Sequence, residues 1–220
     1  AYNKIVKGDA DIIFVAQPSG GQKKRAEESG VTLLYTPFAR EAFVFIVNAD
    51  NPVNSLTEQQ VRGIFSGAIT NWSAVGGDDQ EIQTWQRPED SGSQTVMQSQ
   101  VMKNVRMISP QGTEVASVME GMIKVVAEYR NTNNAIGYTF RYYATQMNAD
   151  KNIKMLAING IAPTAENIRN DKYPYIVDAL MVTRENTTSE TQKLVEWFLT
   201  PQGQSLVEDV GYVPMDKTLH

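Results

Sequence analysis

The sequence predicts an α/β fold, because short apolar runs typical of buried strands alternate with segments of helical pattern. Residues 10–16 (ADIIFVA) form an almost wholly apolar run, as expected for a strand buried on both faces. A polar helical segment at residues 22–29 then ends at Gly30 and leads into an apolar run at residues 31–35. This order of strand, helix and strand is the pattern of a parallel α/β unit.

The segment that follows continues the alternation. Residues 41–48 (EAFVFIVN) are a second apolar run, closed by a turn that contains Pro52. Thr57 and Gln60 have the spacing of a capping box, in which each side chain bonds to the other residue's backbone N–H. The sequence therefore predicts a helix that begins after Thr57 and ends at Gly67.

Later elements follow from the same signals. A strand is expected at residues 81–86, and Met97, Val101 and Val105 mark an amphipathic helix that starts near Ser93. Ser189 and Gln192 form a second capping-box pair, and the helix that they open turns four apolar side chains to a core: Leu194, Val195, Phe198 and Leu199. The remaining predicted elements are a helix at 115–129, strands at 135–140, 153–158 and 173–183, and a helix at 201–210 ended by Gly211.

Charge and hydropathy exclude several classes of partner. The 220 residues include 20 Lys+Arg and 25 Asp+Glu, for a formal net charge of -5, and no basic run could follow a phosphate backbone. Nucleic acid is therefore not an expected partner. No apolar stretch reaches the roughly 20 residues that cross a bilayer. Residues 2–8 resemble the tail of a helix, so we expect that something upstream of Ala1 has been removed.

Residue types that many enzymes need are scarce. The chain has no cysteine, which excludes disulfides and thiolate chemistry, and its single histidine is the terminal His220. Histidine-based catalysis and zinc sites therefore lose their central residue. An enzyme would need Ser91 or Ser93 as nucleophile, and no activating base is identifiable. We expect no enzyme activity, no metal and no cofactor.

The most informative segment is residues 87–95 (RPEDSGSQT), placed between a predicted strand and a predicted helix. The free N–H groups of a helix start attract an anion, and Gly92 allows close backbone approach. Ser91 and Ser93 add hydroxyl donors, while the guanidinium of Arg87 suits a tetrahedral oxyanion. The alternative is an ordinary turn and helix cap, with Arg87 paired to Glu89 or Asp90 at the surface.

Several motifs together resemble the periplasmic phosphate-binding proteins of ABC uptake systems. Residues 55–72 (SLTEQQVRGIFSGAITNW) are similar to a family segment, and the Arg87–Ser93 loop resembles the family motif Arg-x-Asp/Glu-x-Ser-Gly-Thr. Residues 135–138 (AIGY), 201–204 (PQGQ) and 211–214 (GYVP) are similar to later family signatures. The matches follow the family order from about Asp11 onward.

The resemblance implies a type II periplasmic-binding-protein fold, with two α/β lobes joined by crossing strands and the ligand in the cleft between them. Residues 1–48 and 184–220 would form lobe 1, residues 49–172 lobe 2, and residues 173–183 the return crossing strand. Family members begin with a strand and a helix that carry a phosphate loop, and nothing here corresponds. Lobe 1 is therefore expected to be incomplete at its N-terminus.

The resemblance also implies a ligand site. Arg87, Ser91, Gly92 and Ser93 align with the family's ligand loop, where Ser93 replaces the usual threonine and keeps the hydroxyl. Glu89 falls at the position where the family has the acidic partner of the arginine. The first-lobe site departs from the family pattern, because its usual polar residues are replaced and only Gln17 offers a polar contact before Pro18.

These expectations define an extracytoplasmic solute-binding protein of bacterial type that captures phosphate or a similar oxyanion. Its partner would be an ABC permease in the membrane, and we expect a monomer. It would act in the periplasm or at the outer face of the cell membrane, with a lipid anchor (lipoprotein) as one form. The alternative is a phosphate-binding-like domain whose degenerate site serves sensing or surface interaction.

Overall fold

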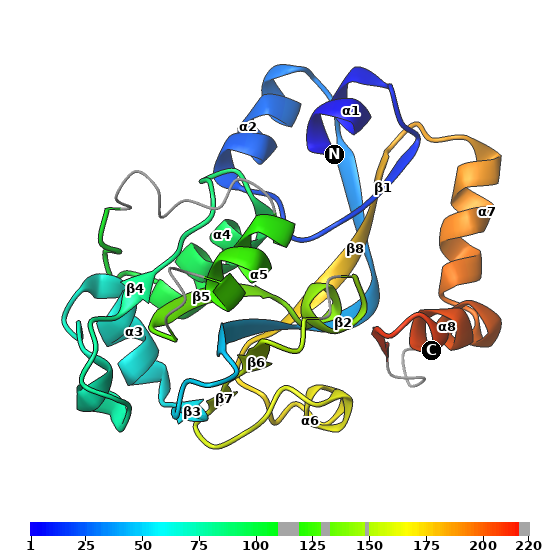
Figure 1. Cartoon of the computed structure of the whole chain (residues 1–220). Helices are drawn as coiled ribbons and strands as arrows, with labels where there is room; N and C mark the ends of the chain where they lie inside the picture. Colours follow the sequence, from blue (N-terminus) through cyan, green and yellow to red (C-terminus); the bar gives the residue numbers. More distant parts are fainter. Residues whose placement is uncertain (110–118, 129–132, 148–149, 216–220) are drawn as a thin grey trace. The chain divides into compact units, whose positions relative to one another are not determined.

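The computed structural model describes residues 1–109, 119–128, 133–147 and 150–215 (Figure 1). Helices and strands alternate along the chain, which confirms the α/β class. The chain forms two compact units: unit 1 contains residues 1–41 and 177–220, and unit 2 contains residues 42–176. The sequence placed its lobe boundaries at nearby but different points, after residues 48, 172 and 183.

Unit 1 is built around β8 (Ile176–Arg184), which pairs antiparallel with β1 (Ile12–Val15), so that Ile12 faces Thr183. Successive β8 side chains enter different cores, as the alternation of a strand requires. Leu180 and Val182 pack with α1, whereas Met181 packs with α8. The helices of this unit are α1 (Tyr2–Lys7), α2 (Gly20–Glu28), α7 (Ser189–Phe198) and α8 (Pro201–Asp209).

The strand predicted at residues 10–16 is confirmed, but the expectation that both of its faces are buried is wrong. Phe14 is 48% exposed, although its ring contacts Phe38 and Phe198 edge-on at centroid distances of 5.4 and 5.3 Å. An aromatic ring can keep much of its surface in solvent while one edge packs.

The start of α7 also differs from its prediction. The N-cap is Thr188, whose side chain accepts from the N–H of Thr191, in place of a box between Ser189 and Gln192. Leu194 and Leu199 are exposed, not buried as expected. Neighbouring hydroxyl residues made the cap position ambiguous by one residue.

The two strands predicted at residues 31–35 and 41–48 are one continuous strand, β2 (Leu33–Asn48). Residues 36–40, which include Pro37, separate the two apolar runs. In the structure, β9 (Val213–Pro214) pairs with Ala39 and Arg40 of β2, and this partner comes from the far end of the chain. A local pattern could not reveal it.

Unit 2 is organised on the second half of β2, which is paired along both edges. β5 (Ala135–Phe140) pairs on one edge, with Phe45 opposite Tyr138, and β6 (Ile153–Met155) pairs on the other. The N–H of Phe43 donates to the carbonyl of Tyr175 at 2.9 Å. Residues 42–47 are fully buried, as expected for a central strand.

Other elements surround this sheet. β4 (Gln83–Thr84) pairs parallel with β5, and β3 (Ser55–Leu56) pairs parallel with β7 (Ala157–Ile158). The helical elements are α3 (Glu58–Ser66), η1 (Trp72–Val75), α4 (Gly92–Val96), η2 (Met97–Met102), α5 (Met119–Glu128), η5 (Tyr143–Met147) and α6 (Ala165–Arg169). The predicted capping box of Thr57 and Gln60 is confirmed at α3.

Helices cover both faces of β5. Phe65 of α3 meets the ring of Tyr138 on one face, whereas α5 packs over Gly137 on the other. A Cβ atom on Gly137 would lie 2.9 Å from Cγ2 of Val126, so this close approach requires glycine. Part of the helix predicted at 115–129 lies outside the described residues.

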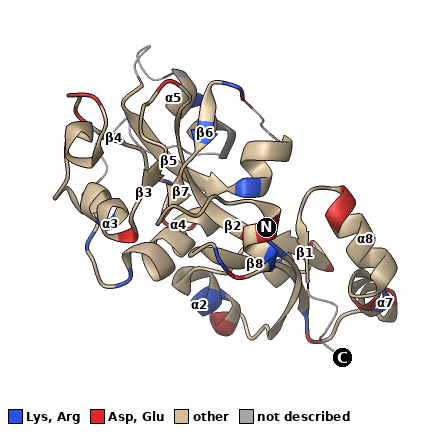
Figure 2. Ribbon diagram, turned by 90° about the horizontal axis from the view of Figure 1, so that it is seen from below, with Lys and Arg blue, Asp and Glu red and all other residues tan. Residues whose placement is uncertain are grey.

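Charges of both signs share the surface helices. Figure 2 shows basic and acidic segments together on α2, where Lys24 and Glu28 form an exposed ion pair at 3.6 Å. Within the part of the chain that the structure describes, no helix is both long enough and apolar enough to cross a bilayer.

The contact of α7 with α8 provides a test of packing in unit 1. A Cβ atom on Gly203 would lie 2.6 Å from the Cα of Phe198. This is a backbone atom, which cannot move aside as the end of a flexible side chain can. We expect Gly203→Ala to lower the free energy of unfolding by about 2 kcal/mol. Gly20→Ala, which meets nothing within 4 Å, is the matched control and should not destabilise. Denaturant unfolding measures both, and an equal effect of the two variants would contradict this packing.

Candidate functional site

The loop that the sequence singled out lies in unit 2, between β4 and α4. Its turn is closed by the N–H of Ser91, which donates to the carbonyl of Pro88 at 2.9 Å. The carbonyl of Ser91 accepts from the N–H of Thr95 at 3.0 Å and from its hydroxyl at 3.1 Å. Hydrogen bonds thus hold the backbone of Ser91 at both its N–H and its carbonyl.

α4 begins at Gly92, which confirms the helix start predicted near Ser93. Its N-cap is Ser91, whose Oγ accepts from the N–H of Gln94 at 3.2 Å. α4 continues directly into η2, and Val105, predicted on the same helix face, lies after it and is 42% exposed.

The first turn of this helix leaves polar groups without partners. Among the described residues, the backbone N–H groups of Gly92 and Ser93 donate no hydrogen bond, as expected for the first positions of a helix. The Oγ atom of Ser93 is also buried and has no partner in the part of the chain that the structure describes, and the residue has no exposed surface. Buried polar groups are otherwise almost always paired, so this set of donors is unusual.

Arg87, in the same loop, supplies a cation. The residue is half-buried, and burial lowers the pKa of its guanidinium, while the nearby hydroxyls of Tyr138 and Tyr143 oppose that shift. An arginine keeps its charge at neutral pH even so. A cation that has lost part of its hydration gains most from an anionic partner.

Two residues of the site were missed by the sequence reasoning: Tyr138 of β5 and Gln94 of α4. The backbone N–H of Arg87 donates to the hydroxyl of Tyr138 at 3.0 Å, and that hydroxyl donates to Oε1 of Gln94. A tyrosine in a largely apolar strand needs a partner for its hydroxyl when the strand is buried. The run AIGYTF therefore contained a signal, although it could not name the partner.

The remaining candidates lie in different places. Glu89 is exposed in the same loop as Arg87, Ser91, Gly92 and Ser93, so the structure brings these five together. Gln17 belongs to unit 1, where it follows β1 and is exposed.

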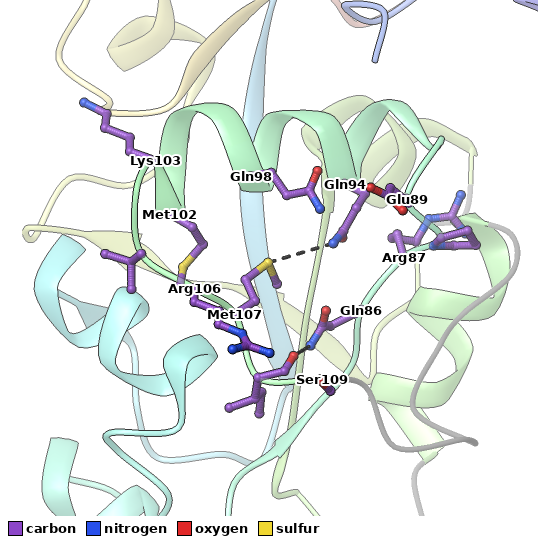
Figure 3. A pocket seen from close by; sticks show the side chains of 13 residues that line it. Gln86, Arg87, Glu89, Gln94, Gln98, Met102, Lys103, Arg106, Met107 and Ser109 are labelled. Carbon is purple, nitrogen blue, oxygen red and sulfur yellow. Dashed lines mark hydrogen bonds between the residues drawn. The ribbon is translucent and has the colours of Figure 1, made fainter. Parts of the chain in front are cut away.

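A pocket of about 490 Å³ adjoins the loop. Figure 3 shows Gln94 and Gln98 directed from the helix into it, with Nε2 of Gln94 3.8 Å from Sδ of Met107. Arg87 and Glu89 lie at one end and Lys103 at the other. Ser93 does not line this pocket, so the buried hydroxyl and the pocket are separate features.

Within residues 1–109, 119–128, 133–147 and 150–215, no three His, Cys, Asp or Glu side chains gather as a metal site would require. The loop itself offers donors and a cation. Such an arrangement binds an oxyanion through hydrogen bonds and charge.

In this α/β chain, the second unit is inserted between two parts of the first, and a loop suited to an anion lies at a helix start. This is the organisation of a solute-binding protein. The model of the PBP superfamily domain matches residues 1–202. The chain therefore belongs to the PBP superfamily, and the family resemblance found in the sequence is confirmed.

Two relatives of this chain are named as phosphate-binding proteins. The chain is 26% identical over 215 residues to the phosphate-binding protein PstS of Borreliella burgdorferi, covering 96% of this chain and 74% of that protein. It is 27% identical over 170 residues to the phosphate-binding protein PstS of Bacillus subtilis, covering 77% of this chain and 53% of the relative. The chain thus spans about half to three quarters of these two proteins.

Solved structures confirm the fold. A candidate phosphate ABC transporter substrate-binding protein from Clostridium perfringens, solved with bound phosphate, matches with a TM-score of 0.81 at 24% identity, covering 98% of this chain and 83% of that one. An ABC-type phosphate transport receptor from Vibrio cholerae matches with a TM-score of 0.70 at 25% identity, covering 97% and 84%.

The two serines of the loop should respond to alanine in opposite directions. Ser93→Ala removes a buried hydroxyl that has no partner within the described ranges, and we expect it to raise the free energy of unfolding by about 1 kcal/mol without ligand. Ser91→Ala removes the N-cap and should lower it by about 1 kcal/mol. Urea unfolding in phosphate-free buffer compares the pair. A destabilised Ser93→Ala would mean that the hydroxyl is satisfied within the protein.

Proposed function

We propose that this chain binds a small oxyanion, inorganic phosphate, through the loop formed by Arg87, Glu89, Ser91, Gly92 and Ser93. The observation that carries the proposal is the buried hydroxyl of Ser93, which has no partner among the described residues and is adjacent to the N–H groups of Gly92 and Ser93. A protein gains stability by pairing or removing such a group. A ligand that accepts hydrogen bonds explains why it is retained.

The charges of the loop favour phosphate in particular. The planar guanidinium of Arg87 matches the edge of a tetrahedral oxyanion. The carboxylate of Glu89 repels a fully deprotonated anion but accepts a hydrogen bond from hydrogen phosphate. Sulfate has no proton to offer at neutral pH, so this carboxylate discriminates between the two by repulsion.

A second contact is proposed from unit 1. Gln17 follows the carboxyl end of β1, where α/β sheets commonly bind ligands, and its amide is exposed. It would replace polar residues that the family usually has near this position. An amide contributes less than a charged partner, so phosphate affinity depends mainly on the Arg87 loop.

The biological role that follows is capture and delivery. We infer an extracytoplasmic receptor, without catalytic activity, that closes on phosphate and presents it to an ABC permease. The names of the relatives, a phosphate-binding protein and an ABC-type phosphate transport receptor, support this role. Lipid anchoring and a monomeric state remain part of the same proposal.

Calorimetric titration with phosphate and, separately, sulfate tests the function. We expect micromolar phosphate affinity, no measurable sulfate binding, and a loss of about 100-fold in Arg87→Ala, which corresponds to about 3 kcal/mol. Arg169→Ala is the control, because Arg169 is exposed on α6 of the same unit. It removes the same charge and should leave the affinity unchanged.

Two results would count against the proposal. Equal losses in Arg87→Ala and Arg169→Ala would show a general charge effect in place of a site at the loop. Absence of binding to either anion would contradict phosphate capture by this chain and would favour the sensing or surface-interaction alternative.

A further inference from the structure

The loop is tied to the sheet by one buried hydroxyl. The Oη atom of Tyr138 accepts from the backbone N–H of Arg87 at 3.0 Å and donates to Oε1 of Gln94. Tyr138 and Gln94, hereafter the Tyr138–Gln94 pair, come from β5 and α4. They therefore connect a strand, a helix and the loop between residues 87 and 91.

The hydrogen-bond directions of this pair are determined by its environment. Burial raises the pKa of Tyr138, against the opposing influence of Arg87, so the hydroxyl keeps its proton at neutral pH. Because this oxygen already accepts from Arg87, its proton goes to Gln94. The amide of Gln94 must then turn its oxygen to Tyr138 and its nitrogen to Sδ of Met107, a weak acceptor at 3.8 Å.

Gln94 also holds the other end of the loop. Its backbone N–H donates to Oγ of Ser91 at 3.2 Å. That bond uses a lone pair of Ser91 and leaves its hydroxyl proton able to donate outward. One residue thus orients Ser91 directly and Arg87 through Tyr138.

The position of Tyr138 is set by packing and not by the loop. The side chain has no exposed surface, and its ring centroid lies 5.4 Å from that of Phe43 and 5.6 Å from that of Phe65. β5 is paired with β2 and with β4. A loop attached to such an element keeps its donors in one geometry before ligand arrives, which reduces the ordering cost of binding.

We propose that Tyr138 and Gln94 are positioning residues for anion capture, which hold Arg87 and Ser91 in binding geometry without touching the ligand. This inference rests on the proposed function, because it assigns a role at the same site. It goes beyond the loop motif, since both residues act through the backbone or side chain of another residue.

Tyr138→Phe is the direct test. The ring and its packing remain, while the N–H of Arg87 and Oε1 of Gln94 lose their partner. We expect the phosphate dissociation constant to rise about tenfold. Tyr173→Phe is the matched control: the hydroxyl of this other buried tyrosine donates to the carbonyl of Phe43 at 3.2 Å, away from the loop. It should leave phosphate affinity unchanged.

A double variant separates positioning from general stability. Gln94→Leu, added to Tyr138→Phe, removes the unpaired amide oxygen with a side chain of similar size. We expect the unfolding midpoint to move back towards that of the wild type while the affinity stays about tenfold weaker or more. Recovery of affinity together with stability would overturn the inference, as would Tyr138→Phe binding within twofold of the wild type.

Amide hydrogen exchange keeps this test independent of the proposed function. In ligand-free protein, the N–H of Arg87 should exchange at least about tenfold faster in Tyr138→Phe than in Tyr173→Phe. Equal exchange would overturn the inference even if phosphate binds. If the wild-type chain binds no phosphate, the proposed function fails, and faster exchange would still support Tyr138 as the anchor of the loop.

Discussion

The pairing of β2 along both edges is the constraint on which unit 2 depends. Hydrogen bonds on both edges fix the register of β2, and a shift by one residue would exchange the faces and remove Phe43 and Phe45 from the ring of Tyr138. β5 takes its position from β2, and Tyr138 takes its position from β5. The loop that begins at Arg87 is attached to this tyrosine. The polar loop that begins at Arg87 is therefore positioned by the most apolar part of unit 2.

Satisfied and unsatisfied groups are distributed unevenly around that loop. Ser91 uses its N–H, its carbonyl and its hydroxyl in local bonds, whereas the hydroxyl of Ser93, two residues later, has no partner among the residues that the structure describes. Stability would improve without the Ser93 hydroxyl, so its presence points to a requirement other than folding.

The sequence predicted what depends on near neighbours. The capping box of Thr57 and Gln60 and the loop after Arg87 are encoded within a few residues, and both are found in the structure. Distant partners decided the rest. The apolar runs at residues 31–35 and 41–48 were predicted as separate strands, but the structure has one strand, β2, which pairs with β9 from the far end of the chain. Tyr138 was assigned to a strand and to a family signature but not to the site, because its partners Arg87 and Gln94 are distant in sequence.

The chain order of the units has a consequence for biosynthesis. Unit 2 is an uninterrupted stretch, whereas unit 1 is assembled from both ends of the chain. β1 leaves the ribosome early, yet its partner β8 is made only after all of unit 2. Unit 2 can therefore begin to fold during translation while the apolar β1, with its exposed Phe14, still lacks a partner. That interval is the stage at which chaperone binding or aggregation of the nascent polypeptide is decided.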